Sequence, residues 1–450
     1  ALVAGGAVLL APPEASAQTL LVRRNVAGLD PNGREIRQLR EAFRIIRQRS
    51  SVNFQDRRGW WLQANIHAAS CAHANWWFLP WHRGYLYYFE RILRQAVNDP
   101  TLTVPYWDWS DPATRRLPAP FWGANNPLNL STRGIGPNDQ APAEFVDRTR
   151  IIEPILNTRS FSTFGGSAST APTQRVAGGS LEGTPHNNMH NWIGGANGDM
   201  SFPVSAARDP IFWLHHANVD RLWAEWARRN PGRQPTDSRW LNQRFSFYNE
   251  AAQLVTIATS NVLTTQALGY RYDTQPAAAP LLLAAAPAAQ RVEAAPPAAA
   301  STLGPQPVTV PLAPTPAMRS ALTTPAAPAA APGGESLQLA IEGIEPPANP
   351  QVLVRVFINL PNADAKTPFE DIHYAGNFSF FTGADQAHNH HRGPLTQLLD
   401  VTETIRRLRE AGQLKEGEPL NVTLVTAPID PKKEAGVRIP FKKVSLSVVR

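Results

Sequence analysis

The sequence predicts a mainly helical N-terminal region followed by a small β-sandwich, and three observations lead to this fold class. In the first half of the chain, apolar residues recur at helical spacing. After Tyr272 the composition changes to mostly alanine and proline. After Gly334, short β-prone stretches are separated by Pro, Asn and Gly, as in strands joined by turns. We therefore expect a leader at residues 1–17, a helical domain at 18–273, a linker at 274–334 and a β-sandwich domain at 335–450.

Three segments justify the helical domain. Ile36 to Arg47 and Leu86 to Val97 each carry apolar residues along one side of a helix. Asp209-Pro210 combines a residue that caps helix N-termini with one that suits the first helical position. We expect that third helix to run to about Arg229.

The linker and the C-terminal region differ in composition. From Pro276 to Pro332 the chain has few charges and almost no aromatic residues, so it cannot bury enough apolar surface to fold alone, and we expect an extended linker. The tail has one short helical stretch, near Val401 to Ala411. Its β-prone stretches are Leu337 to Ile341, Val352 to Ile358, Leu420 to Leu424 and Val444 to Val449.

Composition excludes several classes of protein. The chain has 450 residues, of which 43% are apolar and 18% charged, so wholesale disorder is excluded. A single cysteine excludes a disulfide framework and any multi-cysteine zinc or iron–sulfur site. The net charge of +7 is spread along the chain, and Arg34 to Arg49 reads as a solvated helix face. We therefore predict no nucleic-acid partner, and the oligomeric state stays open.

The first residues read as the remnant of a secretory signal. Ala1 to Leu10 is a short apolar run, and Ala15 to Ala17 is a small-x-small cleavage pattern. The run is too short to span a bilayer, which takes about 20 apolar residues. We therefore expect an exported protein, periplasmic or secreted, with no membrane partner after the signal is cleaved.

Histidines supply the candidate metal ligands. His186 and His190 are four residues apart, which places both imidazoles on one helix face. His215 and His216 lie on the helix that Asp209 opens, about 100° apart around its axis, so we expect only one of them to point at the site. His216 could supply the third nitrogen, and these residues alone leave the choice between it and His215 open.

A second trio lies earlier in the chain. His73 and His82 are nine residues apart, and Pro80 suggests that a helix begins near it, with His82 in its first turn and His73 before it. His67 completes the trio. Three imidazoles at each site suit copper, iron, zinc or nickel, and affinity favours copper, with zinc a rival for either trio alone.

The residues around these histidines resemble a known family. The superfamily of tyrosinases, polyphenol oxidases and molluscan hemocyanins has similar copper motifs, and plant-type polyphenol oxidases have a similar tail. The matching segments are His67 to His73, Phe78 to Leu86, Glu182 to Trp192, Asp209 to Trp223, Tyr270 to Tyr272, Phe357 to Pro361 and Tyr374 to Phe378.

The resemblance implies a type 3 dicopper site in a four-helix bundle, with O2 as co-substrate. Copper A would take His67, His73 and His82. Copper B would take His186, His190 and His216, because the family's last ligand stands four residues before the motif aspartate, here Asp220. The implied activity is a phenol oxidase that hydroxylates monophenols and oxidises o-diphenols to o-quinones. A catechol oxidase that acts only on diphenols and a hemocyanin-like O2 carrier are the alternatives.

Further roles follow from the same resemblance. Glu182 would hold a water and Asn187 would help to activate it, so that a phenol can lose its proton. Pro203 stands where plant-type enzymes often place a bulky gate residue, and Phe212 is expected to pack against the copper B site, so both are candidates for substrate access. Cys71 precedes His73 in a Cys-x-His pattern that carries a thioether between sulfur and imidazole in relatives.

The tail is similar to a domain that covers the active site in latent polyphenol oxidases. The resemblance therefore implies that residues after about 335 shield the coppers until the linker is cut. His388, His390 and His391 form a small His-rich stretch in that domain. A solvated loop is the favoured interpretation of these three residues, and copper handling is the alternative.

Overall fold

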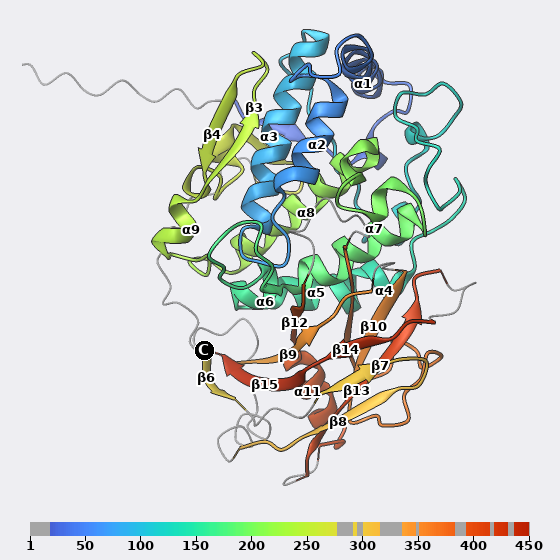
Figure 1. The fold of residues 1–450 in the computed structure, drawn as a ribbon, viewed down its shortest axis with the longest axis vertical. Coiled ribbons are helices and arrows are strands. Elements are labelled where there is room, and N and C mark those ends of the chain that lie inside the picture. The colour runs from blue at the N-terminus through green and yellow to red at the C-terminus, as the bar shows by residue number, and fades with distance from the viewer. Residues whose placement is uncertain are drawn as a thin grey trace, which may run out of the picture.

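A helical region packs on a strand-rich region (Figure 1). The computed structural model describes residues 19–276, 300–315, 335–347, 351–382, 393–414, 418–430 and 436–449, and the backbone of 291–294. Among these residues, no helix is both long and apolar enough to cross a membrane. The predicted leader and the three-histidine stretch His388, His390 and His391 lie outside the described residues.

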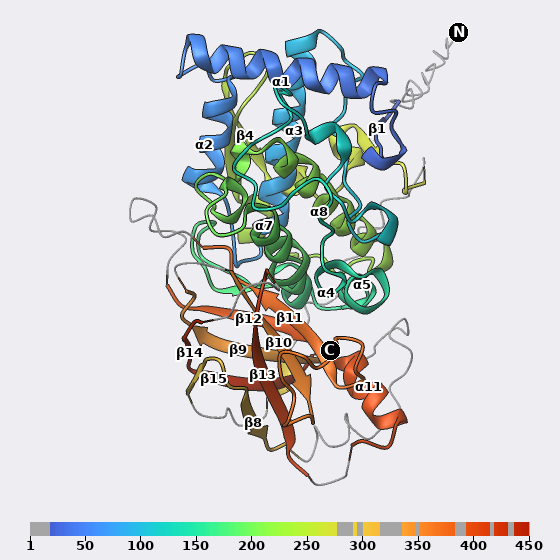
Figure 2. The same cartoon turned by 90° about the vertical axis from the view of Figure 1, so that its right-hand side faces the viewer.

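Four helices form the centre of the helical region: α2 (Trp60–Ser70), α3 (Phe78–Val97), α7 (Asn187–Gly194) and α8 (Pro210–Arg229). Figure 2 shows α1 (Arg34–Val52) lying across α2 and α3. The other α-helices are α4 (Ala143–Val146), α5 (Glu153–Asn157), α6 (Phe161–Gly165), α9 (Ser238–Asn242) and α11 (Thr402–Glu410). Shorter turns of 3₁₀- or π-helix are η1 (Val26–Gly28), η2 (Pro112–Thr114), η3 (Ala119–Phe121), η4 (Arg148–Ile152), η5 (Glu182–His186), η6 (Asp199–Ser201), η7 (Ala206–Arg208), η8 (Thr259–Asn261) and η9 (Gln266–Leu268).

The predicted start of α8 is confirmed, and α3 begins slightly earlier than predicted. The Asp209 side chain accepts a hydrogen bond from the Ile211 amide, and Pro210 is the first residue of α8, which ends at Arg229 as expected. Helix α3 begins at Phe78, two residues before Pro80, so His82 falls in its second turn. Proline is tolerated there because its missing N–H would have no helical partner in the first turn anyway.

Two sheets form the sandwich. The first has the order β11-β10-β13-β8, and all its pairs are antiparallel. The second has the order β2-β12-β9-β15-β6. The strands are β2 (Ala177–Gly178), β6 (Arg291–Ala294), β8 (Val308–Leu312), β9 (Ser336–Ile344), β10 (Val352–Ile358), β11 (Tyr374–Ser379), β12 (Leu395–Asp400), β13 (Leu420–Pro428) and β15 (Lys443–Val449). Three two-stranded pairs complete the fold: β1 (Leu21–Arg23) with β5 (Tyr270–Tyr272), β3 (Arg244–Tyr248) with β4 (Leu254–Ala258), and β7 (Ser301–Leu303) with β14 (Ile439–Phe441).

The expectation of an extended linker over 274–334 is wrong for residues 300–315. Strand β7 pairs with β14, and β8 pairs with β13 inside the first sheet. Val310 and Leu312 alternate with exposed residues and are buried in the sandwich core. The alanine and proline content of the surrounding chain hid this short period-two pattern. These residues therefore belong structurally with the strand-rich region.

Strand β10 of the first sheet is buried on both faces. Val354 and Val356 of β10 point into the sandwich, whereas Leu353 and Phe357 belong to the apolar cluster of the helical region. All seven residues of β10 are buried, which fits a sequence that is apolar except for Arg355. The strand-rich region thus docks on the helices through an apolar sheet face and not only through polar contacts.

Polar contacts cross the same interface. Glu144 accepts hydrogen bonds from Arg355 Nε at 2.6 Å and from the Tyr374 hydroxyl at 3.1 Å. Strand β2, which belongs to the helical region by sequence, pairs in parallel with β12 and becomes an edge strand of the second sheet. We refer to the docked strand-rich region, residues 300–449, as the shield.

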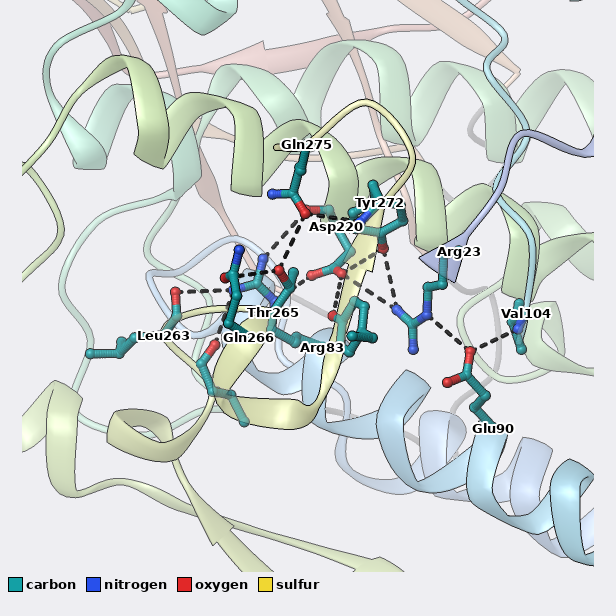
Figure 3. A network of polar contacts seen from close by, with 12 residues as sticks. Arg23, Arg83, Glu90, Val104, Asp220, Leu263, Thr265, Gln266, Tyr272 and Gln275 are labelled. Carbon is teal, nitrogen blue, oxygen red and sulfur yellow. Dashed lines mark hydrogen bonds and ion pairs between the residues drawn. The ribbon is translucent and has the colours of Figure 1, made fainter. Parts of the chain in front are cut away.

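A buried charge network joins α3 to α8 (Figure 3). Asp220 of α8 accepts from Arg83 Nε at 2.5 Å and from the hydroxyls of Tyr270 and Tyr272, each at 2.6 Å. Arg23 lies 3.5 Å from the same carboxylate. Burial alone would raise the pKa of Asp220, but the two guanidinium groups hold it below its usual range. The carboxylate is therefore a fixed anion between two helices.

Replacing Asp220 with Asn tests this network. The variant leaves the buried Arg83 without its counter-charge, whereas Arg23 keeps Glu90, so we expect the free energy of unfolding to fall by about 3–5 kcal/mol. Chemical denaturation followed by tryptophan fluorescence measures it. Glu41→Gln, which breaks the exposed pair with Arg44, is the control and should leave stability unchanged. Equal losses in the two variants would contradict the special role of Asp220.

Candidate metal centre

The six predicted ligands come together at one buried centre between the helices. Each side chain is at most 3% exposed. They arrive from separate elements: His67 on α2, His73 in the segment before α3, His82 on α3, His186 at the end of η5, His190 on α7 and His216 on α8.

The rings form two adjacent trios. The centroids of His67, His73 and His82 lie 5.1–5.5 Å from one another.

In the second trio the corresponding separations are 4.5–5.4 Å among His186, His190 and His216. His82 and His216 stack across the boundary with centroids 4.3 Å apart and planes at 8°. One nitrogen from each of His67, His82 and His216 lies within 4.8 Å of the others. The geometry is thus that of a binuclear site, in which the stacked rings of His82 and His216 form the boundary between the two trios.

Hydrogen bonds orient the rings. The Nδ1 atoms of His67, His82 and His190 lie 2.7–2.8 Å from the backbone carbonyls of Pro203, Phe78 and Met200 respectively. A carbonyl only accepts, so each Nδ1 carries the proton and each Nε2 keeps its lone pair. For His82 this Nε2 is buried without a hydrogen-bond partner in the described part of the chain.

Burial keeps these imidazoles in the neutral form. Burial lowers the pKa of His186 to about 3 and lowers the pKa values of His82, His190 and His216. Neutral imidazoles are the form that binds metal ions. Converging neutral nitrogens in a buried site fit two copper ions, and the donor set consists of imidazoles alone. The residues present therefore fit the dicopper group that the sequence predicts.

His215 also faces the centre, so the expectation that only one of the adjacent histidines would point at the site is wrong. Its ring lies 4.8 Å from that of His190 and 5.3 Å from that of His186. The rings of His215 and His216 lie with their centroids 5.2 Å apart and their planes at 79° to one another. Only His216 stacks on the other trio, and this favours it as the ligand.

Glu182 and Asn187 flank the centre. Both carboxylate oxygens of Glu182 accept from the amide of Ala74, at 2.8 and 3.0 Å, so the group lies beside the backbone that carries His73. Burial raises the pKa of Glu182 to about 7. Asn187 Oδ1 lies 2.8 Å from His186 Nδ1, and its Nδ2 donates to the carbonyl of Ser379 in the shield. The roles of both residues in activating water stay predictions.

Three other predicted residues lie close by. Phe212 is fully buried, with its ring 4.2 Å from that of His216 and 5.0 Å from that of His67, so it packs beneath both trios. Pro203 is buried, and its carbonyl orients His67. The sulfur of Cys71 lies within 4.8 Å of ring nitrogens of His67 and His73. The thioether to His73 stays a prediction that a thiol titration tests.

Sequence reasoning missed Phe381, a shield residue whose ring lies over the centre. Its centroid is 4.2 Å from that of His190, 5.2 Å from that of His73 and 5.6 Å from that of His186. Phe378 and Phe380 belong to the sandwich core, and Phe381, at the next position in the alternation, belongs to the apolar cluster of the helical region. Two successive phenylalanines at the end of an alternating strand were the available signal.

Fold and site together define a class of protein in which a helical bundle holds a binuclear all-histidine metal centre. Comparison with known families agrees. A profile of the common central domain of tyrosinase matches residues 46–150 and 123–229, and one of the polyphenol oxidase middle domain matches 234–280. A profile of a domain of unknown function matches 294–447.

Individual relatives agree as well. The chloroplastic polyphenol oxidase of Malus domestica is 35% identical over 256 residues, 48% of this chain and 43% of that protein. A tyrosinase of Hahella sp. is 31% identical over 279 residues, 51% of this chain and 59% of that protein. The chain thus spans about half the length of these curated relatives. The solved structure of latent apple tyrosinase has a TM-score of 0.72 at 25% identity and covers 96% of this chain and 98% of that one. The chain belongs to the tyrosinase and polyphenol oxidase family.

Metal analysis of two neighbouring variants tests the ligand set. His216→Gln should lower the copper content of the copper-loaded protein from two ions per chain to one or fewer, because the second trio loses one of its three imidazole nitrogens. His215→Gln is the matched control on the same helix and should retain both ions. Loss of copper from His215→Gln but not from His216→Gln would reverse the assignment.

Proposed function

We propose that this protein is a latent type 3 copper phenol oxidase, which hydroxylates monophenols and oxidises o-diphenols to o-quinones with O2. One observation carries the proposal. A phenyl ring of the chain itself, that of Phe381, lies against the imidazoles of both trios, in the place that a phenolic ring would take. The overall reaction balances as one monophenol and one O2 giving one o-quinone and one water.

The protein's residues divide the work as follows. Bound copper would supply the redox chemistry with O2, and the six imidazoles would hold it. Glu182 has a pKa close to neutrality, which suits a group that takes up and passes on a phenolic proton through water. Asn187 fixes the His186 ring through its Oδ1. Phe212 fills the space beneath the rings and excludes water there.

In this proposal the shield keeps the enzyme inactive. Phe381 covers the ring site, and the Asn187 amide is engaged by Ser379. Because β6, β7 and β8 pair with other strands of the strand-rich region, a cut that separates the two regions would fall before Arg291. The boundaries of the helical domain and the shield at about 273 and 300 are part of the proposal. The similarity to a structure named as latent apple tyrosinase supports it.

Limited proteolysis tests latency. Copper-loaded intact protein should oxidise catechol slowly, and its rate should rise by at least about tenfold once the shield has been cut off and released, because the ring site opens. Size-exclusion chromatography must accompany the assay, since the apolar sheet face can hold a cut shield in place. Phe381→Ala in the uncut chain provides a control for the ring alone. Full release without any gain in rate would contradict latency.

A Glu182→Gln variant tests the proton-accepting role. Gln keeps the shape and one acceptor oxygen for the Ala74 amide but cannot take up a proton. On the protein freed of its shield, kcat for tyrosine should fall by about 100-fold and kcat for catechol by much less.

Quinone formation from tyrosine and from catechol, measured on the protein with Glu182 intact and freed of its shield, separates the possible activities. Quinone from catechol alone would indicate a catechol oxidase, and quinone from neither would indicate an O2 carrier. Equal losses on both substrates in Glu182→Gln would argue for a structural role of Glu182.

A further inference from the structure

The end of the molecule that lies away from the shield exposes apolar side chains. Figure 2 shows α1 lying flat across this end, and Figure 1 shows the hairpin of β3 and β4 reaching towards it. Among the described residues, four large apolar side chains are exposed, and three of them lie here: Val52 at 83%, Phe54 at 57% and Leu254 at 61%. Single exposed apolar residues are ordinary on a protein surface, whereas a group of three indicates an interaction site.

The three side chains belong to one patch. Val52 is the last residue of α1, and Phe54 lies in the loop that joins α1 to α2. Arg57 of the same loop lies over the ring of Tyr248, with its guanidinium carbon 5.0 Å from the ring centre. Tyr248 pairs with Leu254 across the hairpin, so Arg57 joins the loop to the strand that carries Leu254. We refer to Val52, Phe54 and Leu254 as the apical patch.

The charge beside the apical patch is positive. Residues 34–58 hold eight arginines and three acidic residues, a net charge of +5. All three acidic residues are already paired with an arginine: Glu35 with Arg24, Glu41 with Arg44 and Asp56 with Arg58. The carboxylates of this segment are therefore neutralised within the chain and leave part of the positive charge free.

Three arginines carry that free charge. Arg37, Arg40 and Arg57 have no acidic partner in the part of the chain that the structure describes, and each donates to a backbone carbonyl. A carbonyl accepts a hydrogen bond from a guanidinium group but does not cancel its charge. Arg37 and Arg57 are exposed, and Arg40 is half-buried. Unpaired cations therefore adjoin exposed apolar side chains on one end of the molecule.

We propose that the apical patch and the outer face of α1 dock this protein on an anionic lipid bilayer. The three apolar side chains would enter the headgroup region, where burial of apolar surface stabilises the docked state. The arginines would lie over lipid phosphates, because α1 runs along this end of the molecule. A soluble polyanion would match the charge but offers no apolar layer for the patch, so the combination favours a bilayer.

Docking in this way fixes the orientation of the molecule. The shield lies at the opposite end, so it would point away from the bilayer, and its release would leave the helical region bound (Figure 2). Binding to lipid needs neither copper nor turnover and does not rest on the proposed function. It replaces the expectation of no membrane partner, which rested on the lack of a segment long enough to span a bilayer.

Co-sedimentation with vesicles tests the apolar contribution. The intact protein should bind vesicles of phosphatidylglycerol and phosphatidylcholine, and should not bind phosphatidylcholine alone. Val52→Ser/Phe54→Ser should lower the partition coefficient at least about tenfold, because two apolar side chains no longer enter the bilayer. Ile372→Ser changes the fourth exposed apolar residue, which lies in the shield, and is the matched control. Its binding should equal that of the unmodified protein, and equal losses in the two variants would overturn the proposal.

A second pair of variants tests the cations. Arg37→Gln/Arg40→Gln removes two unpaired charges beside the bilayer and should weaken binding about fivefold for each arginine. Arg406→Gln/Lys443→Gln removes the same net charge from the shield and should leave binding within about twofold. Equal losses in both double variants would show that net charge matters and its position does not, which would overturn the proposal.

A fluorescent probe reports insertion at the residue itself. Cys71, the chain's single cysteine, is buried, so a thiol reagent should label only an added cysteine in the folded protein. An environment-sensitive dye on Phe54→Cys should shift its emission to shorter wavelength when anionic vesicles are added. The same dye on Ile372→Cys should not shift. A shift at both positions, or at neither, would overturn the proposed orientation.

Two other occupants of the apical patch are outcomes of the same experiments. Full vesicle binding by Val52→Ser/Phe54→Ser, with loss of binding in Arg37→Gln/Arg40→Gln, would indicate a purely electrostatic contact with a polyanion. A dimer in size-exclusion chromatography that Val52→Ser/Phe54→Ser converts to a monomer, without vesicle binding by the unmodified protein, would assign the patch to a second copy of the chain. Either result would overturn docking on lipid.

Discussion

The buried ion pair between Arg83 and Asp220 is the constraint on which the metal centre depends. Arg83 follows His82 directly on α3, and Asp220 stands one turn after His216 on α8. When the pair forms, the two helices are held in one register, and the imidazoles of His82 and His216 stack at 4.3 Å. A buried pair contributes little net stability relative to an apolar one, so its value lies in fixing this register. Tyr270 and Tyr272 complete the carboxylate's hydrogen bonds and tie the end of the helical region to the same point.

The shield and the metal centre are coupled through more than one ring. Strand β12 pairs with β2 immediately before the turn that carries Glu182 and His186. Gly183 lies so close to the Gln397 side chain that a Cβ there would approach it to 2.4 Å. The shield therefore shapes the backbone from which Glu182 projects, in addition to covering the site with Phe381. Opening the site removes the ring and also frees this turn, so the two regions cannot be treated as an enzyme and a passive lid.

Much of this could be predicted because it is local. The spacing of His186 and His190, the Asp209 cap and the apolar period of α3 act within one helix, and the structure confirms the elements they predicted. What failed depends on contacts between distant segments. Residues of β8 form a strand because β13 lies beside them. The ring of Phe381 lies at the metal centre only when the shield is docked on the helices. The expectation for His215 was wrong because the angle between neighbouring residues on a helix does not set the width of the site between them.

The interface between the shield and the helical region combines apolar and polar contacts that have different roles. Leu353 and Phe357 supply apolar area that favours docking whatever occupies the metal centre. Asn187 and Asn191 add hydrogen bonds to the backbone carbonyls of Ser379 and Phe380, next to the ring of Phe381. Different atoms therefore dock the shield and cover the metal centre. The apolar sheet face holds the shield on the helices, whereas the asparagines of α7 hold the strand that ends over the imidazoles. Asn188 and Asn191 also donate to the side chains of Asn377 and Ser379, so part of this polar contact is specific to the shield's own strand.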